Sequence, residues 1–193
     1  MKGSFHRIDG FAVLFCPSRR DSQFRSCRTS LRQAALGRKM ASVPPLMDDD
    51  YIKENTKERD RLFRLTVGLK DPDLARPVGT AWTVATKLLH LAFWDRYALE
   101  LLKRWKTTMP SISTLDVDAV NESVKTLSAA IPYSAIGKLA RDSAGMVDRE
   151  VECATPELRS AVVAAGRERI LKRFIHRRAH LDQVETALGR VCE

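Results

Sequence analysis

The chain has 193 residues, of which 44% are hydrophobic, 30% charged and 7% aromatic, values typical of one globular domain with or without a tail. Its formal net charge is +9. The longest apolar runs, such as residues 11–16, fall well short of the roughly 18 residues that a transmembrane helix needs. Membrane-spanning, collagen-like, coiled-coil and wholly disordered proteins are therefore excluded.

Most of the positive charge belongs to residues 1–46. This segment holds nine of the chain's 33 basic residues but only two of its 24 acidic residues. Because it also lacks hydrophobic periodicity, we predict a disordered basic tail, either an organelle transit segment or the product of a start codon upstream of Met40 or Met47. Residues 47–193 are almost neutral, which argues against a nucleic-acid-binding surface on the folded domain.

The first two predicted helices carry clear start and stop signals. Three aspartates, 48–50, suit the positive end of a first helix, which Gly68 and Pro72 end. Thr83 is the expected N-cap of a second helix that runs to about Trp105.

A long connection, residues 107–131, follows the second helix. Pro110 breaks it early, and a helical segment is expected over 116–128. Pro132 is placed to occupy the first turn of a third long helix, which runs to about Cys153.

The C-terminal part contains two more predicted helices. Thr155 and Pro156 open a short one, and the last long helix spans 166–188 and stops at Gly189. No segment alternates convincingly as a strand. Four principal helices, with a long crossover between the second and third, predict an all-α four-helix bundle over 47–193. A bundle by itself does not indicate a function.

Apart from His6 in the tail, the histidines fall on two of these helices: His90 on the second, and His176 and His180 on the last. A four-residue spacing places two imidazoles on one helix face, where both can reach one metal ion at about 2.0–2.1 Å. His90 has apolar neighbours, among which a ring is costly to bury unless its nitrogens find partners. One ion between the two helices would satisfy all three rings; the alternative is three ordinary core or surface histidines.

Other metal and catalytic motifs are absent from the sequence. A zincin needs a Glu where Arg177 stands, and Glu150 and Glu152 lack the following His of a di-iron bundle. There is no Gly-rich phosphate loop or nucleophile elbow. The four cysteines form no CxxC pair, so neither a thiolate zinc site nor a disulfide framework is predicted, and a reducing, cytoplasmic location is expected.

Two motifs resemble a known family. The segments GTAWTV over 79–84 and LLHLAFWDR over 88–96 resemble the second helix of DinB-like proteins, which include the metal-binding domain of mycothiol-dependent maleylpyruvate isomerases. The segment HRRAHLDQVE over 176–185 is similar to their final helix. The resemblance covers about residues 57–188.

The resemblance implies a four-helix bundle that binds one divalent metal ion, often zinc or nickel. In that family one histidine of the second helix and two of the fourth bind the ion, and His90, His176 and His180 match these positions. Known activities in the family are transfers of low-molecular-weight thiols, thiol-dependent isomerisation and some hydrolysis. The isomerase carries a further C-terminal domain with no counterpart here, so maleylpyruvate isomerisation itself is not expected.

We therefore expect a metal-dependent thiol S-transferase, or a related hydrolase or isomerase, that acts on a small electrophile with a low-molecular-weight thiol as candidate cosubstrate. Three protein ligands leave a coordination position open, as in catalytic zinc sites. The alternative is a non-catalytic metal-binding or stress-related module. The expected partner is a small-molecule thiol or electrophile, and neither a nucleic acid nor a membrane is expected to bind. A homodimer is a possible assembly.

No catalytic residue is assigned from the sequence. Tyr97 and Lys172 are candidates to line the opening, and Trp94 is expected in the core. Gln183 or Asp182 is a candidate to orient a ligand imidazole, since ligating histidines usually donate their second N–H.

Overall fold

The computed structural model describes residues 50–112 and 114–190, so the predicted tail, residues 1–46, lies outside the described residues. Most of the described chain is helical, which confirms the predicted helical fold class. The elements, in chain order, are α1 (Asp50–Val67), α2 (Asp71–Leu74), β1 (Pro77–Val78), β2 (Trp82–Thr83), α3 (Val84–Trp105), α4 (Val117–Ser128), α5 (Tyr133–Glu152), α6 (Pro156–Ala164), the 3₁₀ helix η1 (Glu168–Ile170) and α7 (Arg173–Leu188).

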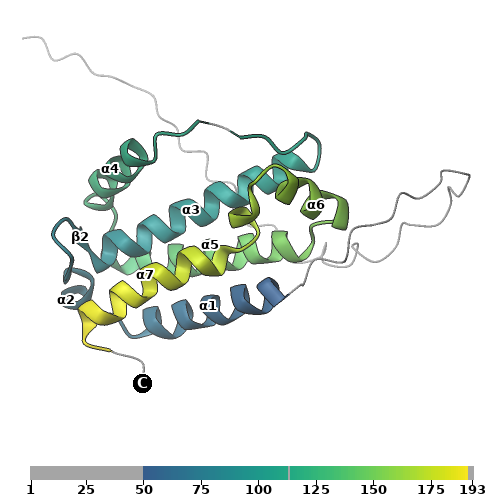
Figure 1. The fold of residues 1–193 in the computed structure, drawn as a ribbon. Helices are drawn as coiled ribbons and strands as arrows, with labels where there is room; N and C mark the ends of the chain where they lie inside the picture. The colour runs from purple at the N-terminus through teal and green to yellow at the C-terminus, as the bar shows by residue number, and fades with distance from the viewer. Residues whose placement is uncertain (1–49, 113, 191–193) are drawn as a thin grey trace, which may run out of the picture. The chain divides into compact units, whose positions relative to one another are not determined.

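The four long helices, α1, α3, α5 and α7, lie side by side (Figure 1). Helix α3 packs against α5 and α7, and α1 packs against the same two helices from the other side. Helix α4 lies on α3. No helix in the described part of the chain has the length and apolar character to cross a membrane.

Local signals set most helix ends, as predicted. The side chains of Thr83, Asp116 and Thr155 accept hydrogen bonds from backbone N–H groups three residues later and so begin α3, α4 and α6. Gly189 ends α7 in the left-handed conformation, with φ of +69°. Because Thr83 fixes the start of α3, it also fixes the helix face on which His90 lies, about two turns further on.

The start of α7 differs from the prediction. The helix begins at Arg173 instead of Gly166, which has φ of +66° and follows the end of α6. Asn55 of α1 holds this boundary: its Nδ2 donates to the Leu171 carbonyl and its Oδ1 accepts from the Phe174 N–H, both at 2.8 Å. A side chain from another helix therefore caps α7, which local sequence signals cannot show.

Two smaller features were also not predicted. Pro72 does more than end α1, because it lies in the first turn of the short helix α2. Strands β1 and β2 form a two-residue antiparallel pair that is too short to produce an alternating pattern. Gly79, with φ of +66°, begins the turn between them, and this pair places Trp82 beside the start of α3.

A buried polar layer accompanies the two apolar clusters of the core. Each long helix contributes one side chain to it, and none of the four is more than 2% exposed: Asn55, Asp95, Asp148 and Arg177. The clusters include Leu62, Leu88, Leu91 and Leu181 in one, and Leu99, Leu102, Val147 and Leu171 in the other. On α3 this polar residue is Asp95, which lies in sequence between the α3 residues of the two apolar clusters and close to the histidines.

Candidate metal centre

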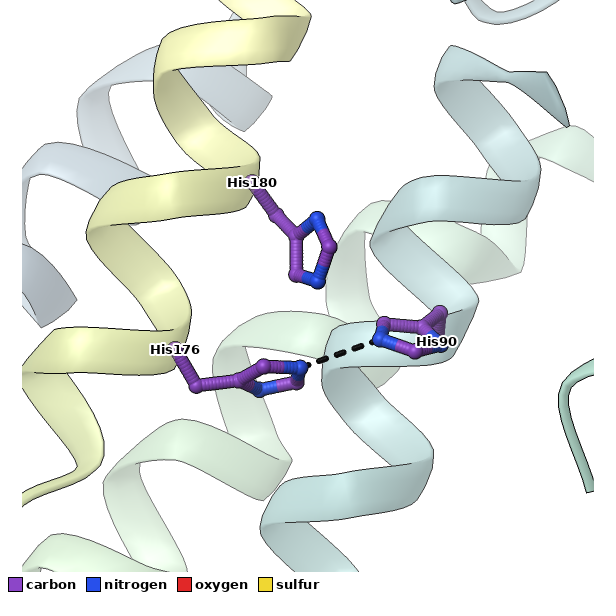
Figure 2. A group of neighbouring side chains, drawn as sticks. All are labelled: His90, His176 and His180. Atoms are coloured by element: carbon purple, nitrogen blue, oxygen red, sulfur yellow. Dashed lines mark hydrogen bonds between the residues drawn. The ribbon is translucent and has the colours of Figure 1, made fainter. Parts of the chain in front are cut away.

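Helices α3 and α7 bring the three predicted histidines together. Figure 2 shows His90 pointing from α3 toward His176 and His180, which project from one face of α7. The Nε2 atoms of His90 and His176 are 3.0 Å apart, and one ring nitrogen from each of the three residues lies within 4.8 Å of the others. The ring centroids are separated by 4.7–5.0 Å. The described chain thus contains a three-histidine cluster that could bind a metal ion.

The cluster lies at the edge of the core. His90 is 5% exposed, whereas His176 and His180 are half-buried, so solvent reaches the cluster from the α7 side. The four-residue spacing on α7 produces the expected pairing of His176 with His180, and the contact between α3 and α7 brings in His90.

The surroundings keep all three imidazoles neutral. Burial, followed by the charge of neighbouring side chains, lowers the pKa of His90 to about 3. Burial and the nearby Arg173 guanidinium lower the pKa of His176 strongly, and burial is also the main cause of the lowered pKa of His180. Neutral imidazole is the form that binds metal ions, so the cluster is held in its ligating state at neutral pH.

Each ring also faces a group outside the cluster. His180 Nδ1 lies 3.1 Å from Gln183 Oε1, so one of the two predicted orienting residues is in place. The other, Asp182, points away and accepts a hydrogen bond from Arg61 at 2.6 Å. Arg173 donates to His176 Nδ1 over 3.3 Å.

His90 faces an incompletely satisfied partner on α4. Its Nδ1 is buried without a hydrogen-bond partner, and so is Asn121 Oδ1. Asn121 nevertheless raises the pKa of His90, as an oxygen that accepts from the ring does, although burial lowers that pKa more. The Asn121 side chain therefore lies near the His90 ring without a hydrogen bond to it.

The buried polar layer holds the α7 side of the cluster. Asp95 is fully buried and accepts hydrogen bonds from Nε of Arg173 at 2.9 Å and from Nε of Arg177 at 3.0 Å. Arg177 also donates to Asp148 at 2.9 Å. Because Arg173 contacts His176, this ion-pair network fixes one ligand candidate relative to both α3 and α5.

Aromatic and basic side chains complete the surroundings. The ring of Trp82 lies 5.3 Å from that of His90, and Trp94, expected in the core, is half-buried with its ring 6.2 Å from His90. Tyr97 packs on Trp94 and on the second apolar cluster, and Lys172 is the N-cap of α7. Within the described residues neither of these two predicted lining residues makes a side-chain hydrogen bond, ion pair or ring contact with the histidines.

Three neighbours of the cluster were not predicted from the sequence. Lys87 and Arg173 each precede a histidine by three residues, a helical spacing that could have indicated them. Asn121 is far from the histidines in sequence and lies on a segment with no recognisable motif, so nothing could have identified it.

The donor set fits a divalent ion with a preference for nitrogen ligands. A tetrahedral ion with metal–nitrogen bonds of about 2.0–2.1 Å separates its ligand nitrogens by about 3.3 Å, close to the 3.0 Å between the Nε2 atoms of His90 and His176. No carboxylate or thiolate belongs to the cluster in the described chain, which disfavours magnesium and calcium.

Comparisons with known proteins leave the family undecided. No protein-family model, no curated protein and no solved structure matches this chain. The helical fold and the histidine cluster therefore stand on this chain's own structure.

Proposed function

We propose that this chain is a DinB-like four-helix bundle that binds one divalent metal ion, zinc or nickel, through His90, His176 and His180, and that it activates a low-molecular-weight thiol toward a small electrophile. The observation that carries the proposal is the convergence of three neutral imidazoles from two helices on one point, open to solvent on one side. The two sequence motifs that resemble the DinB-like family contain these same three residues.

Three ligands from the protein are the pattern of catalytic zinc sites, whereas structural sites have four. When bound, such an ion supplies a Lewis acid with an open coordination position, at which a thiol or a water molecule loses its proton more readily. The half-buried His176 and His180 face the side from which a small molecule can enter.

The surrounding residues have defined tasks in this proposal. Gln183 accepts the Nδ1 proton of His180 and so leaves Nε2 free to ligate, and Asn121 can do the same for His90 after a small adjustment. His176 must move a proton: while Arg173 donates to Nδ1, the ring carries its hydrogen on Nε2. Ligation through Nε2 requires that proton to shift to Nδ1. Arg173 can release the contact because Asp95 holds its guanidinium independently.

The alternative, a non-catalytic metal-binding module, has one observation in its favour. Among the described residues, no carboxylate or nucleophilic side chain belongs to the histidine cluster. Such a module would bind the same ion without turning over a substrate.

Two experiments separate these possibilities. Metal analysis of the purified protein should give one zinc or nickel ion per chain, and His90→Ala or His180→Ala should abolish it, whereas His6→Ala, which removes the remaining histidine, should not. A ratio of one that survives both substitutions contradicts the ligand assignment. Loss of free thiol in the presence of a bimane electrophile then tests catalysis; no turnover by metal-loaded protein with any common cellular thiol favours the module.

A further inference from the structure

Lys87 is a lysine beside the histidine cluster whose side chain is largely buried. It lies on α3, one turn before His90, and is only 8% exposed. Its Nζ is 4.4 Å from the centroid of the Trp82 ring, and that ring in turn packs edge-on against His90. Lys87 and His90 therefore lie against the same indole ring.

No acidic side chain of the described residues pairs with Lys87. Its neighbour Lys125 also lies over Trp82, at 5.5 Å, but bonds to Glu122 at 2.5 Å. Arg173 is likewise paired, with Asp95. The ring of Trp82 is thus the contact that stabilises the Lys87 ammonium, and burial lowers the pKa of this amine.

A partly desolvated ammonium without a carboxylate costs free energy, and an unbranched apolar side chain such as methionine would fill the same space without that cost. With a divalent ion on three neutral imidazoles, the positive charge beside Lys87 would increase further. An anion bound between the ion and Lys87 would offset both charges.

We propose that Lys87 is a specificity-determining residue that binds the carboxylate, or an equivalent anionic group, of the small molecule whose thiol occupies the metal centre. This inference rests on the proposed function and narrows it to acidic thiols. Lys87 donates to the anionic group from one side, while Trp82 holds the lysine side chain in place. The competing explanation is that Lys87 only packs on Trp82, in which case its removal changes stability and not ligand preference.

The test is a thiol titration of the full chain loaded with cobalt(II), followed by the visible absorption of the ion. The two probes are 3-mercaptopropionate and its neutral methyl ester, which carry the same thiol and differ in charge. The wild-type protein should bind the acid about tenfold to a hundredfold more tightly than the ester. Lys87→Met should abolish this preference and leave ester binding unchanged. Lys87→Arg should retain most of it.

Lys125→Met is the matched control, because Lys125 also lies over the Trp82 ring but its charge is already neutralised by Glu122. The preference of this variant for the acid over the ester should differ from that of the wild type by less than twofold. Equal affinity of the wild type for both probes, or a preference that survives Lys87→Met, overturns the inference while leaving the metal centre intact. If cobalt does not bind to the histidines, the proposed function and this inference both fail. Circular dichroism of Lys87→Met verifies that the variant is folded, and Lys87→Arg decides the question if it is not.

Discussion

Asp95→Asn gives the sharpest test of the buried polar layer. The Asp95 carboxylate is fully buried and neutralises two guanidinium groups, those of Arg173 and Arg177, which are themselves no more than 5% exposed. Removing one partner of a buried ion pair costs about 3–5 kcal/mol, because the other charge stays buried without compensation. Arg173 would lose the carboxylate that neutralises it, whereas Arg177 would keep its pair with Asp148, so we expect a loss within that range.

The assay is urea unfolding of the metal-free protein at pH 7, followed by circular dichroism. Asp182→Asn serves as the control, because the Asp182 side chain is 59% exposed and its pair with Arg61 is of the surface type, worth about 0–1 kcal/mol. A loss of less than about 1 kcal/mol for Asp95→Asn would refute the argument that this carboxylate compensates two buried charges. In the folded fraction of the variant, metal affinity should also fall, since Arg173, which contacts His176, would lose the ion pair that fixes its position relative to α3.

Three further predictions concern the cluster and its supports. Asn121→Ala should weaken metal binding by about tenfold to a hundredfold in a competition titration, because His90 Nδ1 then has no group to orient it; unchanged affinity contradicts this role. Asn55→Ala should lower the free energy of unfolding by about 2–4 kcal/mol, measured in urea, because it leaves two buried backbone groups of the α7 start unpaired; a neutral effect would mean that α7 needs no cap from α1. The metal-free protein should lose stability from pH 7 to pH 5. Folding lowers the pKa of the three histidines, so the unfolded chain binds more protons than the folded chain below about pH 6.5. The free energy of unfolding should therefore fall by up to about 1.4 kcal/mol per pH unit for each ring, and by less where the ring is half-exposed. Urea midpoints that do not change over this interval would contradict the neutral cluster.

The features that sequence predicted well are those that local chemistry decides. A capping hydroxyl such as Thr83 acts on N–H groups within one turn, so its effect is visible in a short stretch of sequence. The same holds for the pairing of His176 with His180, which follows from helix geometry alone. Their meeting with His90 depends on how two helices pack, and it was predicted from the apolar surroundings of that residue and from the family resemblance.

Features that depend on distant residues could not be predicted in this way. The predicted start of α7 was wrong by seven residues, because Asn55 of α1 supplies the cap of this helix from across the core. Asn121 lies near His90 because α4 packs on α3. Lys87 is one turn from His90 in sequence, yet its burial and its lack of an acidic partner emerge only when Trp82 and α7 are in place.

The claim on which the proposed function depends is that three imidazoles share one ion. X-ray absorption spectroscopy of the zinc-loaded protein counts the imidazole ligands directly. We predict three histidine nitrogens at about 2.0–2.1 Å with one additional light-atom ligand. A shell that contains sulfur from the protein, or no more than one imidazole, would contradict the assignment of His90, His176 and His180 as the metal centre.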